Sequence, residues 1–238
     1  MKTLFTLILL TFNCAIYSQE KPNQNELNNK AFNDLLQKYV TNSGEVNYKG
    51  FLYEKEKFDI YLNRLSNNIP NSSWSKNKQL AYWMNVYNAF TIELIINNYP
   101  TNSIKNIKNP WKKRFIKIGD EYKSLSDIEH RILRKMNDPR IHFGINCASY
   151  SCPPLYNNAF TEKTVQKTLD SLTCKFVNDS KRNSITKMSI DISKIFQWFS
   201  NDFKKEETLI EFLNKYSIIQ IEENAKITYK KYNWTLNE

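Results

Sequence analysis

The sequence is poor in the residues and patterns that define several common classes of protein. It holds four cysteines in 238 residues, which is too few for a disulfide scaffold, so a hydrophobic core has to stabilise the fold. Beyond the first residues, no apolar run has the length of a membrane span. No repeat, linker or low-complexity stretch divides the chain. We therefore expect one domain without a transmembrane anchor.

The basic residues lack the concentration that a nucleic-acid-binding surface requires. Lysine and arginine number 34 against 24 acidic residues, a formal charge of +10, but they are scattered along the chain. The densest cluster, at 105–117, fits a solvated loop and strand edge, so we expect no nucleic-acid partner. Hydrophobic residues make up 41% of the sequence and aromatic residues 14%, which is typical of a folded protein with a dense core.

The first residues have the layout of a secretory signal peptide. A positive start at Met1-Lys2 precedes a short apolar run at 4–12, and the small residue Ser18 precedes Gln19-Glu20, which is the order of parts in such a peptide. We predict a signal peptide at 1–18, a flexible leader at 19–29 and the domain itself at 30–238. The protein is then exported, to the periplasm or the exterior.

Hydrophobic periodicity predicts a mainly helical α+β domain with a small antiparallel sheet. Apolar residues recur at helical spacing in most segments, and extended segments are few and short. The expected helices cover about 30–40, 51–65, 75–98, 124–137, 163–177, 195–203 and 208–216. The expected strands cover 115–118 with 121–123, then 189–192 and 226–229.

The helix expected at 75–98 is the strongest of these. Ser75 can cap it and Pro100 forbids its continuation, and a wide apolar stripe predicts that it is central and largely buried. Asn85 and Asn88 lie three residues apart on this helix. Because a buried amide without a partner is costly, each should bond a neighbouring loop or face a functional site, and the structural role is favoured.

The helix expected at 124–137 carries three further polar candidates. Ser126 and Glu129 have the spacing of a capping box, which would make Glu129 a structural cap partner. His130 and Arg134 lie one turn apart and share a face of the helix.

Residues 138–155 hold most of the unusual chemistry. Residues 140–146 alternate strictly between polar and apolar, which predicts a strand. Arg140, His142, Gly144 and Asn146 would face one way, with Gly144 leaving room for a close approach to the backbone. On that strand Cys147 would point away from His142, which places more weight on Cys152 in the following loop.

Three roles are open to Cys147 and Cys152. A disulfide closing a small loop suits an exported protein and is slightly favoured. A thiolate beside His142 is the working pair of cysteine hydrolases and acyltransferases. A metal site of two cysteines and a histidine is the weakest alternative, because no second cluster of ligands exists. We predict neither a metal nor a cofactor.

Four segments together resemble the DUF547 family, a family without an assigned reaction. They are AYWMNVYNAF at 81–90, SLSDIEHRILR at 124–134, DPRIHFGINCASYSCPPL at 138–155 and YNWTLN at 232–237. Some relatives are intracellular, where disulfides are disfavoured, so the resemblance implies a thiol role more than this sequence alone does. The positions characteristic of the family correspond here to Tyr82, Trp83, Asn85, Tyr87, Asn88, Glu129, His130, Arg134, Arg140, His142, Asn146, Cys147, Ser149, Cys152 and Pro153.

Two hypotheses about function follow. In the first, the protein is a thiol-dependent hydrolase or acyltransferase. Its nucleophile is Cys147 or Cys152, its base His142 or His130, its orienting group Asn146 or Glu129, and its oxyanion donor Asn85 or Asn88. A distant likeness to papain or transglutaminase folds would fit, although the start of the central helix, where those folds place the nucleophile, has no cysteine.

The second hypothesis is a protein without chemistry. In a binding module, charge recognition would come from Glu129, His130, Arg134 and Arg140, with Arg134 or Arg140 binding an anionic small or polymeric ligand. In a structural envelope protein, the polar cluster would only lock helix to strand.

Overall fold

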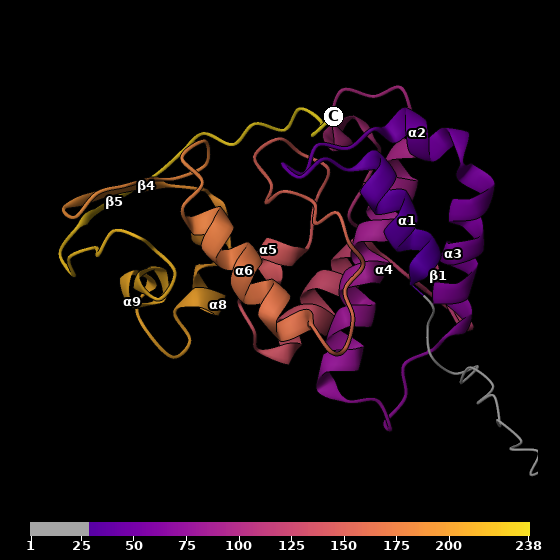
Figure 1. Cartoon of the computed structure of the whole chain (residues 1–238), viewed down its shortest axis with the longest axis horizontal. Coiled ribbons are helices and arrows are strands. Elements are labelled where there is room, and N and C mark those ends of the chain that lie inside the picture. The colour runs from indigo at the N-terminus through magenta and orange to yellow at the C-terminus, as the bar shows by residue number, and fades with distance from the viewer. Residues whose placement is uncertain (1–28) are drawn as a thin grey trace, which may run out of the picture.

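The structure is a computed structural model that describes residues 29–238. The predicted signal peptide and all of the leader except Asn29 lie outside these residues. Figure 1 shows the helices of the first half of the chain at one end of the molecule and the sheet β3–β5 at the other. Within residues 29–238 no helix combines the length and the apolar character needed to cross a membrane.

The prediction of a mainly helical α+β domain is confirmed. Ser75 caps α4 as expected, since its side chain accepts a hydrogen bond from the Lys78 amide, and every residue from Leu80 to Ile92 is buried. Nine α-helices occur in the described part of the chain: α1 (Lys30–Tyr39), α2 (Tyr48–Tyr53), α3 (Lys55–Asn67), α4 (Lys76–Ile96), α5 (Ile141–Gly144), α6 (Val165–Val177), α7 (Ile195–Trp198), α8 (Ser200–Phe203) and α9 (Leu209–Asn214).

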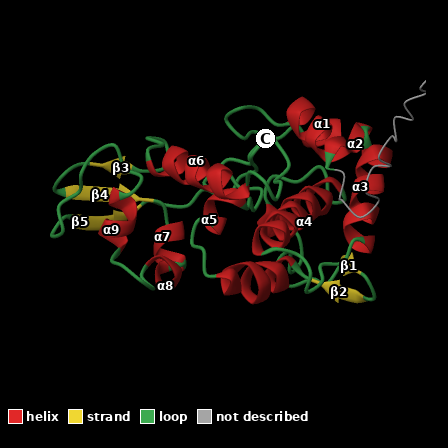
Figure 2. Ribbon diagram, turned by 60° about the horizontal axis from the view of Figure 1, so that its bottom comes forward, coloured by secondary structure: helices red, strands yellow, loops and turns green. Residues whose placement is uncertain are grey.

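Two small sheets lie at opposite ends of the molecule (Figure 2). Strands β1 (Ile116–Ile118) and β2 (Glu121–Lys123) form the predicted antiparallel hairpin. Strand β4 (Ser189–Ile192) pairs antiparallel with β3 (Ser184–Ile185) and parallel with β5 (Lys226–Tyr229). After β5 the chain runs back across the molecule to end beside the first helices (Figure 1).

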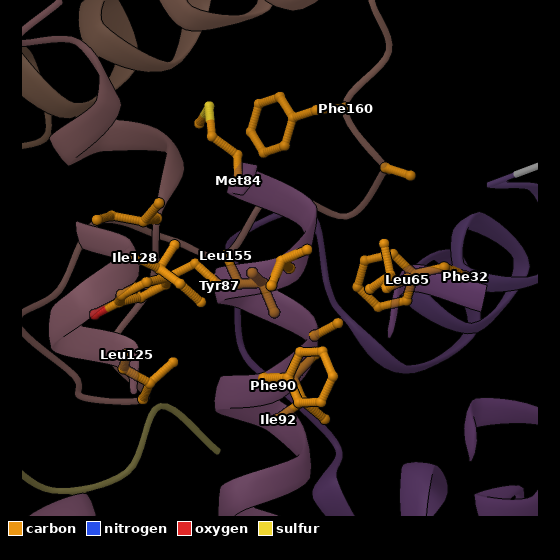
Figure 3. Packing of buried hydrophobic residues seen from close by; sticks show 14 of the residues in the cluster. Phe32, Leu65, Met84, Tyr87, Phe90, Ile92, Leu125, Ile128, Leu155 and Phe160 are labelled. Carbon is orange, nitrogen blue, oxygen red and sulfur yellow. The ribbon is translucent and has the colours of Figure 1, made fainter. Parts of the chain in front are cut away.

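The buried side chains form two hydrophobic clusters with α5 between them. The larger cluster surrounds α4, and Figure 3 shows Tyr87 of this helix beside Ile128 of the neighbouring helix. The smaller cluster joins α6, β4 and α7–α9. Ile141 and Ile145 belong to the first cluster, whereas Phe143 belongs to the second. The segment around His142 is therefore held from two sides.

The predicted strand at 140–146 is wrong, because residues 141–144 form helix α5. The Asp138 side chain accepts a hydrogen bond from the Arg140 amide, and its carbonyl accepts one from the Ile141 amide. An aspartate followed by proline is a favourable helix start. The alternation of polar and apolar residues arises from a short helix that is buried by two separate clusters.

The space left by Gly144 is filled by the protein itself. A Cβ atom at this position would lie 2.0 Å from the terminal methyl of Met84 and 3.1 Å from the Phe160 ring. Both side chains are visible around α4 in Figure 3. Glycine thus allows α5 to approach α4 closely. The room predicted beside the Gly144 backbone is occupied by these side chains and is not left open.

The predicted capping box of Ser126 and Glu129 is also wrong. Ser124 caps instead: its hydroxyl accepts from the Asp127 amide, and the Asp127 carboxylate accepts from the Ser124 amide. The following turn is a π-helix, η2 (Asp127–Leu133), continued by the 3₁₀ turn η3 (Arg134–Met136). Glu129 is consequently released from capping and buried.

Candidate active site

A cavity of about 230 Å³ opens where the two hydrophobic clusters meet. Its lining joins residues that are far apart in the sequence, and most of the lining side chains are apolar or aromatic. The polar candidates in the lining are Glu129, His130, His142, Cys147 and Cys152. The other lining residues are Tyr87, Trp111, Ile145, Pro153, Ile195, Trp198, Phe199, Tyr232 and Trp234.

A tight turn places the two cysteines side by side in this lining. Ala148 has a φ of +56°, a left-handed conformation that costs about 1–2 kcal/mol for a residue with a Cβ. The Asn146 side chain holds the turn by accepting a hydrogen bond from the Ala148 amide. Both cysteines are free thiols, with Sγ atoms 3.0 Å apart. The structure thus contains a dithiol where a disulfide was slightly favoured.

Cys147 is the thiol that ionises first. Its Sγ lies 3.0 Å from Cys152 Sγ, 3.2 Å from Ser149 Oγ and 3.4 Å from the Tyr232 hydroxyl. A thiolate at this position accepts hydrogen bonds from all three groups. The bond with Cys152, followed by those with Ser149 and Tyr232, outweighs burial and lowers the pKa of Cys147 to about 7.

Cys152 is the weaker acid of the pair. Burial, and then the hydrogen bond with Cys147, raise the pKa of the Cys152 thiol well above its usual value. The Cys147 amide donates a further hydrogen bond to the Cys152 sulfur at 3.0 Å. In the neutral pair Cys147 Sγ donates to Cys152 Sγ, and Cys152, which stays protonated, becomes the donor once Cys147 has ionised. Cys147 is therefore the better candidate nucleophile, although strand parity favoured Cys152.

His142 lines the same cavity and is oriented by Asp202 of α8. Its Nε2 donates to Asp202 Oδ2 at 2.8 Å, and Arg134 holds that carboxylate with two hydrogen bonds of 2.6 and 2.8 Å. These bonds keep the pKa of Asp202 well below its usual range, so the carboxylate is ionised and fixes the proton of His142 on Nε2.

The second ring nitrogen of His142 is the basic one. Among the described residues, every fully buried side-chain nitrogen or oxygen has a hydrogen-bond partner. His142 Nδ1 has no partner among these residues, so it is not fully buried and faces the cavity that the ring lines. Burial lowers the pKa of His142, which keeps the imidazole neutral at pH 7. The ring is held by stacking on Phe199, with ring centroids 4.0 Å apart.

Glu129 is the second unusual acid of the cavity. Its Oε2 accepts a hydrogen bond from the Tyr87 hydroxyl at 3.1 Å. Burial is the main reason that the pKa of Glu129 is raised to about 7, and the nearby Cys147 adds to the shift. Near neutral pH a large fraction of Glu129 is therefore a neutral carboxylic acid, which can donate a hydrogen bond.

His130 lies at the rim of the site. Its Nδ1 is 3.0 Å from Arg134 Nη1, and its ring lies 6.3 Å from that of Phe199. Burial and the Arg134 charge lower the pKa of His130. His130 is more exposed than His142, and its bond to Arg134 links it to the Asp202 group.

Three predicted site residues serve as internal connectors. Asn85 pairs with both backbone groups of Phe160, and Asn88 bonds the Gly144 carbonyl and the Asn146 amide. Asn146 in turn bonds the Pro153 carbonyl. These amides fix α5 and the cysteine turn against α4, and none of them belongs to the cavity lining.

The two arginines proposed for ligand binding are engaged within the protein. Arg134 is occupied by Asp202, while Arg140 bonds Asp138, Gln166 and Asp170 away from the cavity. In the described residues, no three of the histidine, cysteine and acidic side chains are placed to hold a metal ion.

Sequence reasoning did not find Asp202, Tyr232 or Trp234. Asp202 lies between Phe199 and the buried Phe203, and a lone carboxylate between two aromatic residues is the only signal that could have indicated it. Tyr232 and Trp234 belong to the YNWTLN segment, which the family resemblance had marked. This segment lies over the cysteine turn, since the Tyr150 amide donates to the Thr235 carbonyl.

The fold and cavity define an α+β domain with a dithiol, an oriented imidazole and a buried carboxylic acid. A family model described as "Protein of unknown function, DUF547" matches residues 71–177. This match confirms the family resemblance, and the chain contains a DUF547 domain. Neither the curated proteins nor the solved structures include a match to the chain. The suggested likeness to papain and transglutaminase folds stays a prediction.

Proposed function

We propose that the protein is a thiol-dependent hydrolase or acyltransferase with Cys147 as its nucleophile. One observation carries this proposal: a single cavity is lined by the more acidic thiol of a dithiol and by an imidazole whose basic nitrogen is directed into it by Asp202. A thiol, a base and a group that orients the base are the parts of a nucleophilic site.

In the first step Cys147 is acylated. Because no direct hydrogen bond joins Cys147 Sγ and His142 Nδ1 in the described residues, the thiol proton passes to His142 Nδ1 through one bridging water. The sulfur then attacks the carbonyl carbon of an ester, thioester or amide. Protonated Glu129 donates a hydrogen bond to the oxygen on which negative charge develops. The bond from carbon to the leaving group then breaks, and the leaving group takes the proton from His142. The product is a thioester on Cys147.

In the second step the acyl group leaves Cys147. Water or another acceptor gives its proton to His142 Nδ1 and attacks the thioester carbonyl. The carbon–sulfur bond breaks and the sulfur regains a proton from His142. Water as acceptor makes the protein a hydrolase, and an amine or alcohol makes it an acyltransferase.

Trapping the acyl-enzyme tests this proposal. We expect p-nitrophenyl acetate to release nitrophenolate in a burst and to add one acetyl group to Cys147, found by intact mass and peptide mapping. Cys147→Ser should show no burst, whereas Cys174→Ala, which changes the exposed cysteine, should behave as the wild type. Acetylation confined to Cys174, or none in the folded protein, would contradict the proposal.

The alternative of an anion-binding module has less support. Both guanidinium groups that it requires are already bound to carboxylates of the protein. We propose further that this activity is exported, because of the layout of the first 18 residues. Mature protein in a periplasmic or culture fraction, beginning near Gln19, would support export, and full-length protein in the cytosol would oppose it.

A further inference from the structure

One wall of the cavity, which begins at Tyr232 beside the Cys147 sulfur, is built of aromatic rings. Trp198 lies 4.7 Å from Tyr232 and 5.7 Å from Trp234, measured between ring centroids. Tyr232 and Trp234 are 4.5 Å apart, and Trp111 extends the row at 5.6 Å from Trp234. Three separate parts of the chain contribute these rings: the turn that holds Trp111, helix α7 and the C-terminal segment 232–237.

These rings are more accessible than core aromatics. Trp198 is 46% exposed, and Trp111, Tyr232 and Trp234 are half-buried, although the protein has a dense aromatic core elsewhere. Accessible aromatic surface that continues into a cavity with a few polar groups is the usual form of a small-molecule binding site. The wall therefore fits the apolar part of a ligand whose reactive group lies at Cys147.

The charges around the cavity favour an uncharged ligand group. Arg134 is neutralised by Asp202, and the pKa of His142 is lowered by burial, so neither offers a free positive charge. Lys105 lies 5.4 Å from the Trp234 ring centroid and is not in the cavity lining. A carboxylate in the cavity would have no cationic partner there.

The volume sets the size of the group. A cavity of about 150 Å³ binds benzene, so this cavity of about 230 Å³ takes roughly nine heavy atoms by the same ratio. A phenylacetyl group has nine: a ring, one methylene and the carbonyl. Such a group would stack its ring against the aromatic wall and keep the carbonyl for the thiol.

We infer that the acyl group accepted by this site is uncharged and carries an aromatic ring, in the manner of an arylacetyl ester or thioester. This inference rests on the proposed function for its reactive end. The recognition of the ring depends on the wall alone, so it is measurable without catalysis.

Binding is measured with the full mature chain by tryptophan fluorescence, because three of the five tryptophans line the cavity. The probes are 2-phenylacetamide, cyclohexylacetamide, acetamide and phenylacetate. We expect 2-phenylacetamide to bind roughly 10- to 100-fold more tightly than acetamide, from burial of the ring. It should also bind about 2- to 10-fold more tightly than cyclohexylacetamide, from ring stacking.

Two outcomes of that series overturn the inference. Equal or tighter binding of cyclohexylacetamide would remove the aromatic preference, and equal or tighter binding of phenylacetate would remove the preference for an uncharged group. Trp198→Ala should weaken 2-phenylacetamide binding about tenfold, because it removes one ring of the aromatic wall. Tyr122→Ala, at an exposed aromatic outside the cavity lining, is the matched control and should leave binding unchanged.

Acylation separates this inference from the proposed function. Acetylation of Cys147 by p-nitrophenyl acetate without binding of 2-phenylacetamide overturns the aromatic acyl class and leaves the thiol chemistry standing. Binding of 2-phenylacetamide while phenylacetyl thioesters never acylate Cys147 leaves the ring-binding wall standing and overturns the thiol chemistry. Faster acylation by phenylacetyl than by acetyl thioesters, lost in Trp198→Ala, supports both.

Discussion

The Nε2 atom of His142 lies 2.8 Å from Oδ2 of Asp202, a residue 60 positions further along the chain. This bond determines which ring nitrogen carries the proton, and so which one can act as a base. It also joins α5 to α8, which belong to different parts of the chain. The cavity therefore depends on a contact that no local sequence motif encodes.

Asp202→Asn should reduce acylation of Cys147 without unfolding the protein. An amide cannot hold the Nε2 proton in the way an ionised carboxylate does, so the basic lone pair no longer faces the cavity. We expect a fall of about 10²- to 10⁴-fold in the acylation rate, as in other sites that lose such an orienting carboxylate. Stopped-flow release of nitrophenolate measures it.

Asp170→Asn is the control for this substitution. Asp170 also bonds an arginine, Arg140, but it is exposed and remote from the cavity lining. Its acylation rate should remain within twofold of the wild type. A similar loss in both variants would show that arginine pairing, and not orientation of His142, explains the effect.

Much of the fold could be predicted from the sequence, because its strongest signals are local. The apolar stripe of α4, its cap at Ser75 and the breaker Pro100 lie within one segment and agree with each other. The segment 140–146 was mispredicted because its alternation reflects two hydrophobic clusters that meet only in the folded chain. A short pattern carries no information about what packs on each side of it.

The candidate site was predictable in its members more than in its geometry. His142, Cys147 and Glu129 were found because their residue types are rare or costly to bury. The relation between His142 and Cys147 was wrong while it depended on strand parity, and the left-handed turn at Ala148 could not be foreseen from an alanine. Asp202 was missed since its partner lies in another element.

Cys152→Ala should make Cys147 a weaker acid. The strongest stabilisation of the Cys147 thiolate is the hydrogen bond from Cys152, so its loss moves the pKa of Cys147 back toward its usual value. The substitution is made in a Cys174→Ala background, so that Cys147 is the one cysteine left in the described residues. Labelling of Cys147 by iodoacetamide at pH 7 should then slow roughly tenfold.

Cys152→Ser provides the matched comparison in that background. A serine hydroxyl can replace the thiol as a donor, so the labelling rate and its midpoint in a pH titration should stay close to those of the Cys174→Ala parent. If serine and alanine shift the midpoint equally, the hydrogen bond from Cys152 is not the cause of the low pKa.

Glu129→Gln should remove a pH-dependent loss of stability. The pKa of Glu129 is raised from 4.5 to about 7 in the folded state, so the folded protein retains this proton between these values while the unfolded chain releases it. Stability is then fully present below pH 4.5 and lost as the pH rises to 7, by about 3 kcal/mol. Glutamine does not titrate, and the variant should lack this contribution.

Urea unfolding at pH 4.5 and pH 8 measures the difference. The free energy of unfolding of Glu129→Gln, relative to the wild type, should increase by about 3 kcal/mol between these two values. Glu121→Gln, at an exposed strand residue, serves as the control and should change little. If the difference in unfolding free energy between Glu129→Gln and the wild type is the same at pH 4.5 and pH 8, the Glu129 carboxyl of the folded protein is ionised over this whole pH range.

Mild oxidation should close a disulfide between Cys147 and Cys152 and stop acylation. The two sulfurs are already neighbours at 3.0 Å, and the Cys147 thiolate is the attacking species in disulfide formation. Treatment with diamide, which accepts the two hydrogens lost by the thiols, should abolish iodoacetamide labelling of both cysteines. Dithiothreitol should restore labelling and the nitrophenolate burst together.

Cys152→Ala distinguishes this reaction from general oxidation. Without the second thiol, diamide should give no disulfide within this turn. A disulfide that joins Cys147 to Cys174 of a second molecule should appear on non-reducing gels instead. Persistent labelling of Cys147 in oxidised wild-type protein, at an unchanged rate, would contradict the dithiol arrangement.

Asn88→Ala should weaken both the fold and the site, because Asn88 satisfies two buried backbone groups at once. Its side chain bonds the Gly144 carbonyl at the end of α5 and the Asn146 amide at the start of the cysteine turn, both at 2.9 Å. Leaving these groups without partners should cost about 2–4 kcal/mol of unfolding free energy. Asn63→Ala, at an exposed position on α3, should cost less than about 0.5 kcal/mol.

Since α5 carries His142 and the turn carries Cys147, the folded Asn88→Ala variant should also acylate more slowly. A stability loss with an unchanged acylation rate would show that Asn88 supports the core alone and does not position the reacting groups.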